Sequence, residues 1–422
     1  MKYRLGYQSF FKTTLCLISL LMILSCITEE IIEPEKKRTI LFYIGSDTNG
    51  LDNGSVGDEP RQQIDAIRAG WIPGRGELII YADQTNRPPC LMRINETRNK
   101  DGLFGIDTLQ IYPEENSADA AVLNRVIHTV VRDFPADSYG LLFFSHASGW
   151  LPEGALTHPR SAQSNPRSLV IDKGDGVIRE MSYTDFAAAI PDNLFDFIIF
   201  DACLMADVLS MYELRNKTEY VLASSAEIVS PGYTPIYQNE IKKLVDTRQS
   251  TRLVVTGFAQ SYMDYIKKTY SEEDIYCSAT LSVIRMDEMP NLASTVKDAL
   301  NGKRIDETTL AVDLIQRFDR PNKLIVSGQR KNRYFDLEHV IETVALDSHI
   351  ESFRAQMKKT VVWKSHTKRF LLTDSGSGNP NYADYDGYFI NHHSGLTTYI
   401  EQTAYPVLNV AYQNSSWYKA IH

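Results

Sequence analysis

The sequence lacks the spacing motifs of common metal sites and the motif of a serine nucleophile. The HExxH and paired CxxC patterns of zinc sites are absent, and the nine histidines show no metal-ligand spacing, so we expect no catalytic metal. A G-x-S-x-G motif is also absent, which argues against an α/β hydrolase that uses serine.

Long apolar runs are missing after residue 24. Before that point, the first twelve residues carry three basic side chains and residues 14–24 are apolar, which is the pattern of a secretory signal. The segment Ile23-Leu24-Ser25-Cys26 resembles a bacterial lipobox, which implies cleavage before Cys26 and lipidation of its thiol. The alternatives are an ordinary signal peptide or a membrane anchor helix. No later stretch approaches the roughly 20 apolar residues that a membrane span needs.

Cysteine is scarce too. The chain has five cysteines, and if Cys26 carries lipid the exported protein keeps Cys90, Cys203 and Cys277. Three thiols do not make a disulfide framework in a chain of this length. At most one pair can form, and a disulfide between Cys90 and Cys277 stays open.

Positive charge is in deficit. The chain has 44 Lys and Arg against 53 Asp and Glu, for a net charge of −9, and loss of the signal removes three more positive charges. This balance argues against a nucleic-acid partner and favours basic partners or substrates.

The length of 422 residues suggests two domains, because a domain has about 150 residues. We expect a signal peptide at residues 1–25 and a polar tether at 26–37. Residues 38–245 would form an α/β catalytic domain, and residues 246–422 a smaller α+β region packed on it.

Two predicted strands end on reactive side chains. Residues 194–200 are rich in Phe and Ile, which is typical of a strand buried on both faces of a parallel sheet, and Cys203 follows them. Residues 139–145 predict a similar strand, followed by His146. Because parallel strands end at the same edge of a sheet, we expect His146 and Cys203 to meet there as base and nucleophile. The alternative is a buried cysteine and an unrelated histidine.

A helix is predicted directly after Cys203, because apolar residues between 204 and 214 follow helical spacing. Its N-terminus would favour the thiolate. Asp201 lies two residues earlier, so strand alternation directs it to the same side as Cys203.

The remaining pattern predicts an alternation of strands and helices. Strands are expected at residues 38–45, 77–82, 90–94, 108–111, 277–284 and 395–400, and helices at 62–69, 118–134, 252–270, 289–300, 336–344 and 350–361.

The reactive residues lie in the blocks Phe144-Ser-His-Ala-Ser-Gly-Trp150 and Phe200-Asp-Ala-Cys-Leu-Met-Ala206. These blocks resemble the two signatures of the clostripain (C11) family of cysteine peptidases. Further similarity is found at Phe134-Pro-Ala-Asp137, Tyr212-Glu-Leu214, Ser225-Ala-Glu227, Pro231-Gly232-Tyr233, Gly395-Leu-Thr-Thr-Tyr399 and Trp417-Tyr418. The resemblance covers roughly Arg38 to the end, and it implies a caspase-like three-layer α/β sandwich with a mainly parallel sheet.

The resemblance also implies a role for each site residue. Cys203 would be the nucleophile, and His146 would protonate the leaving amine. The backbone N–H groups of Ala147 and Cys203 would form an oxyanion hole. Asp201 would lie at the base of the S1 pocket and bind an Arg or Lys side chain, with Glu227 as a second negative wall. The alternative for Asp201 is a purely structural charge near a helix N-terminus.

One residue departs from the family pattern, which usually has glycine where this chain has Ala147. Alanine keeps the N–H group but would not reach a glycine-only φ, so the efficiency of catalysis is in question. An alternative function is therefore an inactive surface protein of the same fold that captures basic peptides.

Two further expectations concern maturation and ligands. Some family members cut themselves after a basic residue in the region of 151–168, so Arg160 and Arg167 are candidate self-cleavage sites, and an uncut exposed loop is the alternative. Expected partners are peptides with Arg or Lys at the cleaved bond and a membrane reached through lipidated Cys26, and no cofactor is expected. The resemblance leaves a structural calcium ion open, although no ligand pattern in the sequence supports one.

Overall fold

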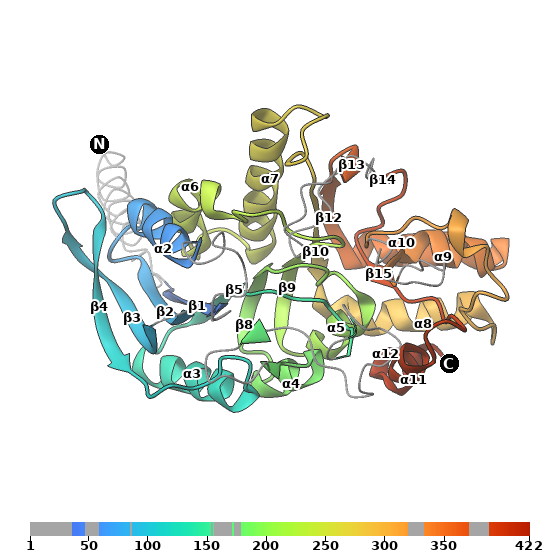
Figure 1. The fold of residues 1–422 in the computed structure, drawn as a ribbon, viewed down its shortest axis with the longest axis horizontal. Helices are drawn as coiled ribbons and strands as arrows, with labels where there is room; N and C mark the ends of the chain where they lie inside the picture. The colour runs from blue at the N-terminus through green and yellow to red at the C-terminus, as the bar shows by residue number, and fades with distance from the viewer. Residues whose placement is uncertain are drawn as a thin grey trace, which may run out of the picture. The chain divides into compact units, whose positions relative to one another are not determined.

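Five parallel strands form the centre of a nine-stranded sheet (Figure 1). In sheet order they are β9 (Thr218–Ala223), β8 (Phe195–Asp201), β5 (Ser138–Phe144), β1 (Arg38–Ser46) and β2 (Gly76–Gln84). The computed structural model describes residues 36–46, 59–84, 87–152, 155, 171–172, 179–319, 333–370 and 388–422. The mainly parallel sheet that the sequence predicts is confirmed.

Antiparallel strands extend this sheet on both sides. β3 (Arg87–Arg98) pairs with β2, and β4 (Phe104–Ile111) pairs with β3. The strands predicted at 90–94 and 108–111 are therefore confirmed, and they form a hairpin. On the other side, β10 (Thr280–Arg285) pairs with β9, and β12 (Val361–His366) pairs with β10. β12 lies outside the predicted elements.

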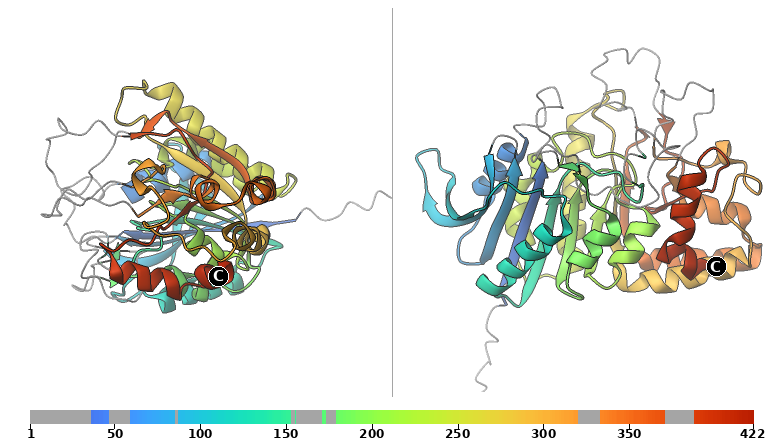
Figure 2. Two further views of the ribbon diagram at one scale, coloured as in Figure 1. Left: turned by 90° about the vertical axis from the view of Figure 1, so that its right-hand side faces the viewer. Right: turned by 60° about the horizontal axis from the view of Figure 1, so that its bottom comes forward.

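Helices cover both faces of the sheet and make a three-layer sandwich (Figures 1 and 2). One face packs against α2 (Glu59–Gly70), α6 (Thr234–Leu244) and α7 (Thr251–Thr269), and the other against α3 (Ala120–Asp133), α4 (Tyr183–Ala189) and α5 (Val208–Leu214). Because side chains alternate along a strand, Phe197 and Ile199 of β8 join the first layer, whereas Ile198 and Phe200 join the second. The burial of this strand on both faces is as predicted.

Residues after 245 contribute both to the sheet and to the layers on its two faces. They supply β10 and β12, so strands from both sides of the predicted boundary belong to one sheet. The other elements in the described part of the chain are β6 (Ile171–Asp172), β7 (Arg179–Glu180), a 3-10 turn (Met286–Glu288), α8 (Met289–Leu300), a second 3-10 turn (Val312–Leu314), β11 (Phe335–Asp336), α9 (Leu337–Val344), α10 (Asp347–Thr360), β13 (Arg369–Phe370), β14 (Tyr388–Phe389), β15 (Thr397–Thr398), α11 (Pro406–Asn414) and α12 (Ser416–Ile421). Apolar side chains of α8, α9 and α12 join the same hydrophobic layer as α3 to α5. The separate status of residues 246–422 stays a prediction.

Most predicted helices are confirmed, and several boundaries differ from the prediction. α2 begins at Glu59 rather than at residue 62, and α10 at Asp347 rather than at residue 350. α3 begins at Ala120, because the carboxylate of Asp119 accepts a hydrogen bond from Ala121 N–H at 2.8 Å and caps the helix two residues beyond the predicted cap. The strand predicted at 395–400 is reduced to the two residues of β15.

The N-terminal predictions lie outside the described residues. These are the signal peptide, the lipidation site Cys26 and most of the tether at 26–37. Within the described ranges, no helix combines the length and the apolar character needed to cross a membrane.

Candidate active site

His146 and Cys203 follow two neighbouring strands that end level with each other. β5 and β8 pair in parallel, and Phe144 of β5 lies opposite Asp201 of β8. Each reactive residue stands two positions beyond this last pair, and neighbouring strands are about 4.8 Å apart. Both residues are half-buried. The structure therefore brings the two residues to the same edge of the sheet.

The turn after β8 differs from the predicted helix. Leu204 has a φ of 62°, a left-handed conformation that an α-helix cannot include. α5 begins only at Val208, and Asp207 caps it by accepting a hydrogen bond from Ser210 N–H at 2.8 Å. The prediction that a helix N-terminus favours the Cys203 thiolate was therefore wrong.

A backbone N–H group takes the place of that helix. Ile228 N–H donates a hydrogen bond to the Sγ atom of Cys203 at 3.4 Å. A donor directed at sulfur stabilises the thiolate relative to the thiol. The loop after β9, which carries Ile228, thus contributes to the electrostatics of the nucleophile.

The loop that carries His146 is tightly packed against the turn that carries Cys203. A Cβ atom on Gly149 would lie 2.6 Å from the carbonyl oxygen of Leu204, and the φ of Gly149 is 56°, so only glycine fits this contact. Next to it, the side chain of Trp150 is buried, and its ring centroid lies 4.8 Å from that of Tyr399.

Segments near the C-terminus support both loops. The hydroxyl of Tyr334 donates a hydrogen bond to the carbonyl oxygen of Ser148. Thr397 N–H donates to the carbonyl oxygen of Ala206 at 2.8 Å, and a bridge joins Thr397 to Asp207. Burial raises the pKa of Asp207 to about 7. Sequence reasoning had singled out the segment of Thr397 only by resemblance and gave it no role.

Asp201 lies buried at the end of β8, with 4% of its surface exposed. Its carboxylate accepts hydrogen bonds from Tyr233 N–H and from the Gln63 amide, each at 3.1 Å. Burial raises the pKa of Asp201 to about 7, although these two hydrogen bonds lower it. Gly232 leaves room for the carboxylate, because a Cβ atom there would collide with it. The loop at Gly232 and Tyr233 is thus fitted to Asp201.

The comparison with protein families decides the class of the chain. The model of the clostripain family, peptidase C11, matches residues 66–421, which include both reactive residues. The chain belongs to the clostripain family. Members of family C11 are cysteine peptidases, so the chain has the framework of such an enzyme.

Solved structures of C11 proteases have the same caspase-like α/β fold as this clostripain-family chain. An inactive zymogen C11 protease from Parabacteroides distasonis is 25% identical, with a TM-score of 0.72 over 93% of this chain and 100% of its own. A secreted C11 cysteine protease from Bacteroides thetaiotaomicron, solved with an irreversible peptide inhibitor, is 24% identical, with a TM-score of 0.72 over 92% of this chain and 99% of its own. No curated protein matches the chain.

The departure of this clostripain-family chain at Ala147 does not require a glycine conformation. Among the described residues other than glycine, a positive φ occurs at Asn193, Leu204 and Asn301. Ala147 has a negative φ and is 7% exposed. The backbone of Ala147 itself is therefore unstrained, and the effect of this residue on catalytic efficiency stays a prediction.

Sequence reasoning missed a carboxyl group that the clostripain fold brings near Asp201. Glu59, the first residue of α2, is buried and accepts a hydrogen bond from the hydroxyl of Ser230. No motif marks this position, and only the folded helix reveals it. Glu227, the predicted second negative wall, is half-buried in the loop next to Ile228, and its role stays a prediction.

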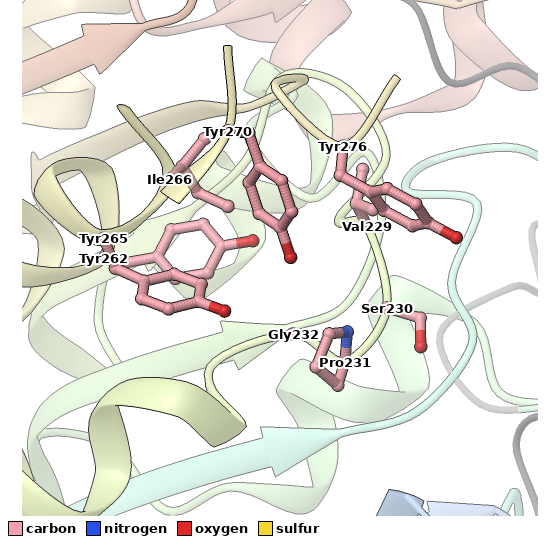
Figure 3. A pocket seen from close by; sticks show the side chains of 9 residues that line it. All are labelled: Val229, Ser230, Pro231, Gly232, Tyr262, Tyr265, Ile266, Tyr270 and Tyr276. Carbon is pink, nitrogen blue, oxygen red and sulfur yellow. The ribbon is translucent and has the colours of Figure 1, made fainter. Parts of the chain in front are cut away.

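A hollow with an empty volume of about 190 Å³ borders the same loop. Its lining residues come from the loop and from α7 and the segment after it, and they are Val229, Ser230, Pro231, Gly232, Tyr262, Tyr265, Ile266, Tyr270 and Tyr276. Figure 3 shows the hydroxyl groups of Tyr262, Tyr265 and Tyr270 pointing toward Pro231. The loop thus lies between an aromatic hollow and the nucleophile.

Three further points of the sequence analysis concern self-cleavage, a disulfide and metal ions in this clostripain-family chain. Arg160 and Arg167, the candidate self-cleavage sites, lie outside the described residues. Cys90 and Cys277 form no disulfide with each other. Within the described ranges, no group of three or more His, Cys, Asp or Glu residues could hold a metal ion.

Proposed function

We propose that this cysteine peptidase is an exported, lipid-anchored endopeptidase that cuts after arginine or lysine with a dyad of Cys203 and His146. The observation that supports the dyad most is the level ending of β5 and β8, with buried Asp201 at the end of β8. Membership of the clostripain family supports the same chemistry.

In this proposal, the Sγ atom of Cys203 attacks the scissile carbonyl carbon as a thiolate and forms the S–C bond, and the π electron pair of the C=O bond moves to the carbonyl oxygen. The N–H groups of Ala147 and Cys203 bind that oxygen. The C–N bond breaks as His146 protonates the leaving amine, and an acyl group remains on Cys203. Water then gives a proton to His146 while its oxygen adds to the thioester carbonyl carbon. The C–S bond breaks, the acid product leaves, and the Cys203 thiolate and the protonated His146 are restored. The hydrogen bond from Ile228 N–H supports the thiolate that the first step needs.

The carboxylate of Asp201 would select the basic side chain. A guanidinium or ammonium group gains charge-assisted hydrogen bonds there, whereas a neutral side chain would leave a buried charge without a partner. Glu227 is proposed as an outer contact, because it precedes Ile228, which contacts the nucleophile.

A panel of fluorogenic peptides that differ only in the residue before the cleaved bond tests this function. The wild-type protein should hydrolyse the arginine and lysine reporters and leave the aspartate and norleucine reporters intact. Cys203→Ala protein, purified in the same way, measures any contaminating peptidase. Saturable binding of the basic peptides without turnover would favour the alternative of a capturing protein. Hydrolysis of the aspartate reporter alone would contradict the proposed specificity.

We also propose two maturation steps on segments outside the described residues. Cys26 would become the lipidated N-terminus after removal of residues 1–25, as the apolar run and the lipobox-like segment indicate. The segment 151–168 would be cut by the protein's own active site after Arg160 or Arg167, because this segment follows His146 closely in the sequence and contains both arginines.

Intact-mass measurement on protein extracted from membranes checks both steps. Wild-type protein should give two fragments whose masses place the cut after Arg160 or after Arg167. The N-terminal fragment should begin at an acylated Cys26. Cys203→Ala protein should be acylated in the same way but remain one chain. Two fragments in the Cys203→Ala sample would rule out self-cleavage, and an unmodified Cys26 would rule out the lipid anchor.

A further inference from the structure

Two side chains near the start of α2, one turn apart, lie close to Asp201. Glu59 is the first residue of the helix, and Gln63 follows one turn later on the same face. Both are buried, with exposed fractions of 7% and 0%. Gln63 donates a hydrogen bond to Asp201 at 3.1 Å, and Glu59 accepts one from Ser230 in the loop that also fits around Asp201. One helical face thus reaches both the carboxylate and the loop.

The charges of Glu59 and Asp201 influence each other. Burial raises the pKa of Glu59, whereas its hydrogen bond with Ser230 and the nearby imidazole of His146 lower it. Burial also raises the pKa of Asp201, and Glu59 adds to this rise because like charges repel. A cation that binds beside both groups would relieve their repulsion and part of their lost hydration.

A separate observation indicates a ligand that donates hydrogen bonds. The Oε1 atom of Gln63 is buried and has no hydrogen-bond partner in the part of the chain that the structure describes. It belongs to the same planar amide whose nitrogen contacts Asp201, so it lies beside that carboxylate. A buried acceptor without a donor is unfavourable, and a guanidinium has five N–H groups in one plane that can satisfy several acceptors together.

We propose that Glu59 is a second carboxylate of the pocket for the basic side chain and that Gln63 Oε1 accepts a hydrogen bond from the same side chain. This inference rests on the proposed cleavage after arginine or lysine. Ser230 holds Glu59 in place, and Figure 3 shows its side chain turned away from the tyrosines of the hollow. Because a guanidinium can contact two carboxylates and an amide oxygen at once, the pocket should prefer arginine to lysine.

The test is Glu59→Gln, measured on three reporters that end in arginine, lysine or citrulline. Citrulline has nearly the shape of arginine without the charge. The variant should lower kcat/KM for the arginine reporter by about 10- to 100-fold, which is typical of one lost charged partner, and leave the citrulline reporter within about twofold. Glu59→Asp, which keeps the charge, should recover part of the loss. Glu240→Gln is the matched control, since Glu240 is a buried glutamate on α6 that pairs with Lys243.

Each outcome supports or overturns the inference. An arginine-to-citrulline ratio in Glu59→Gln equal to that of the wild type overturns it, whether or not both rates fall, because a uniform loss would mean that Glu59 acts on His146 or on folding. If Glu59→Gln does not fold, Ser230→Ala takes its place, because it removes the hydrogen bond that holds Glu59. An arginine-to-citrulline ratio equal to that of the wild type in this variant then overturns the inference. A wild-type protein that does not prefer basic reporters contradicts the proposed function itself, before any variant is compared.

Discussion

The substitution Cys203→Ala is expected to lower kcat/KM for an arginine reporter at least about 10,000-fold, because it removes the proposed nucleophile. The fold should survive, since only one sulfur atom is lost from a half-buried position in a turn that is held by Gly149 and Thr397. Stopped or continuous fluorescence assays measure the rate, and thermal unfolding measures the fold.

The matched control for this variant is Cys90→Ala. Cys90 is also half-buried, but it lies in the antiparallel hairpin at the far side of the sheet. Cys90→Ala should leave kcat/KM within about twofold of the wild-type value, whereas Cys203→Ala should abolish turnover. Equal activity in both variants would show that the thiol at position 203 takes no part in the reaction.

The substitution Asp201→Asn is expected to lower kcat/KM for the arginine reporter by about 100-fold, because a buried charge that pairs with the guanidinium is lost. This fold-change corresponds to roughly 3 kcal/mol of lost transition-state stabilisation. Turnover of a citrulline reporter should change little, since the asparagine keeps the shape of the carboxylate. An arginine reporter cleaved as fast as before would refute the role of Asp201 in specificity.

Titration of Asp201 should make the preference for arginine over citrulline depend on pH. Because the pKa of Asp201 is raised to about 7, the group is mostly protonated below that pH in the free protein and cannot pair with a cation. The ratio of kcat/KM for arginine to that for citrulline should therefore rise between about pH 6 and pH 8 in the wild type and stay flat in Asp201→Asn. Taking this ratio cancels the titration of Cys203 and His146, which affects both reporters equally.

The stability of the substrate-free protein should change in the opposite direction. A carboxyl group whose pKa is raised by folding gives stability that is fully present below its unfolded pKa near 3.8 and is lost as the pH rises through the folded value of about 7. The melting temperature of the wild type should fall over this range, and Asp201→Asn should remove part of the fall. Asp207, whose pKa is also about 7, accounts for a further part.

The sequence was sufficient to predict the two central strands that lead to His146 and Cys203, and insufficient to predict the turns that follow them. Runs of Phe and Ile predict strands buried on both faces, and parallel strands must end at one edge, so the meeting of His146 and Cys203 could be foreseen. The helix predicted at Leu204 failed because apolar spacing reports burial and not backbone conformation. Leu204 is buried as a helical residue would be, but its left-handed φ makes a turn.

Residues brought together only by the tertiary fold could not be foreseen. Glu59 matches no motif, and its proximity to Asp201 depends on how α2 packs over the sheet. Tyr334 and Thr397 support loops that lie almost 200 residues earlier in the chain, at Ser148 and Ala206. Periodicity and motif spacing describe neighbours along the chain and carry no information about such contacts.

The support given by Tyr334, Thr397 and Tyr399 also sets the order in which a newly made molecule can become competent. The ribosome completes both reactive loops long before it adds the segments that brace them. An unfinished polypeptide therefore carries its nucleophile in an unbraced turn. Synthesis of the bracing segments, rather than of the reactive ones, is the step after which the proposed nucleophile can take its supported conformation.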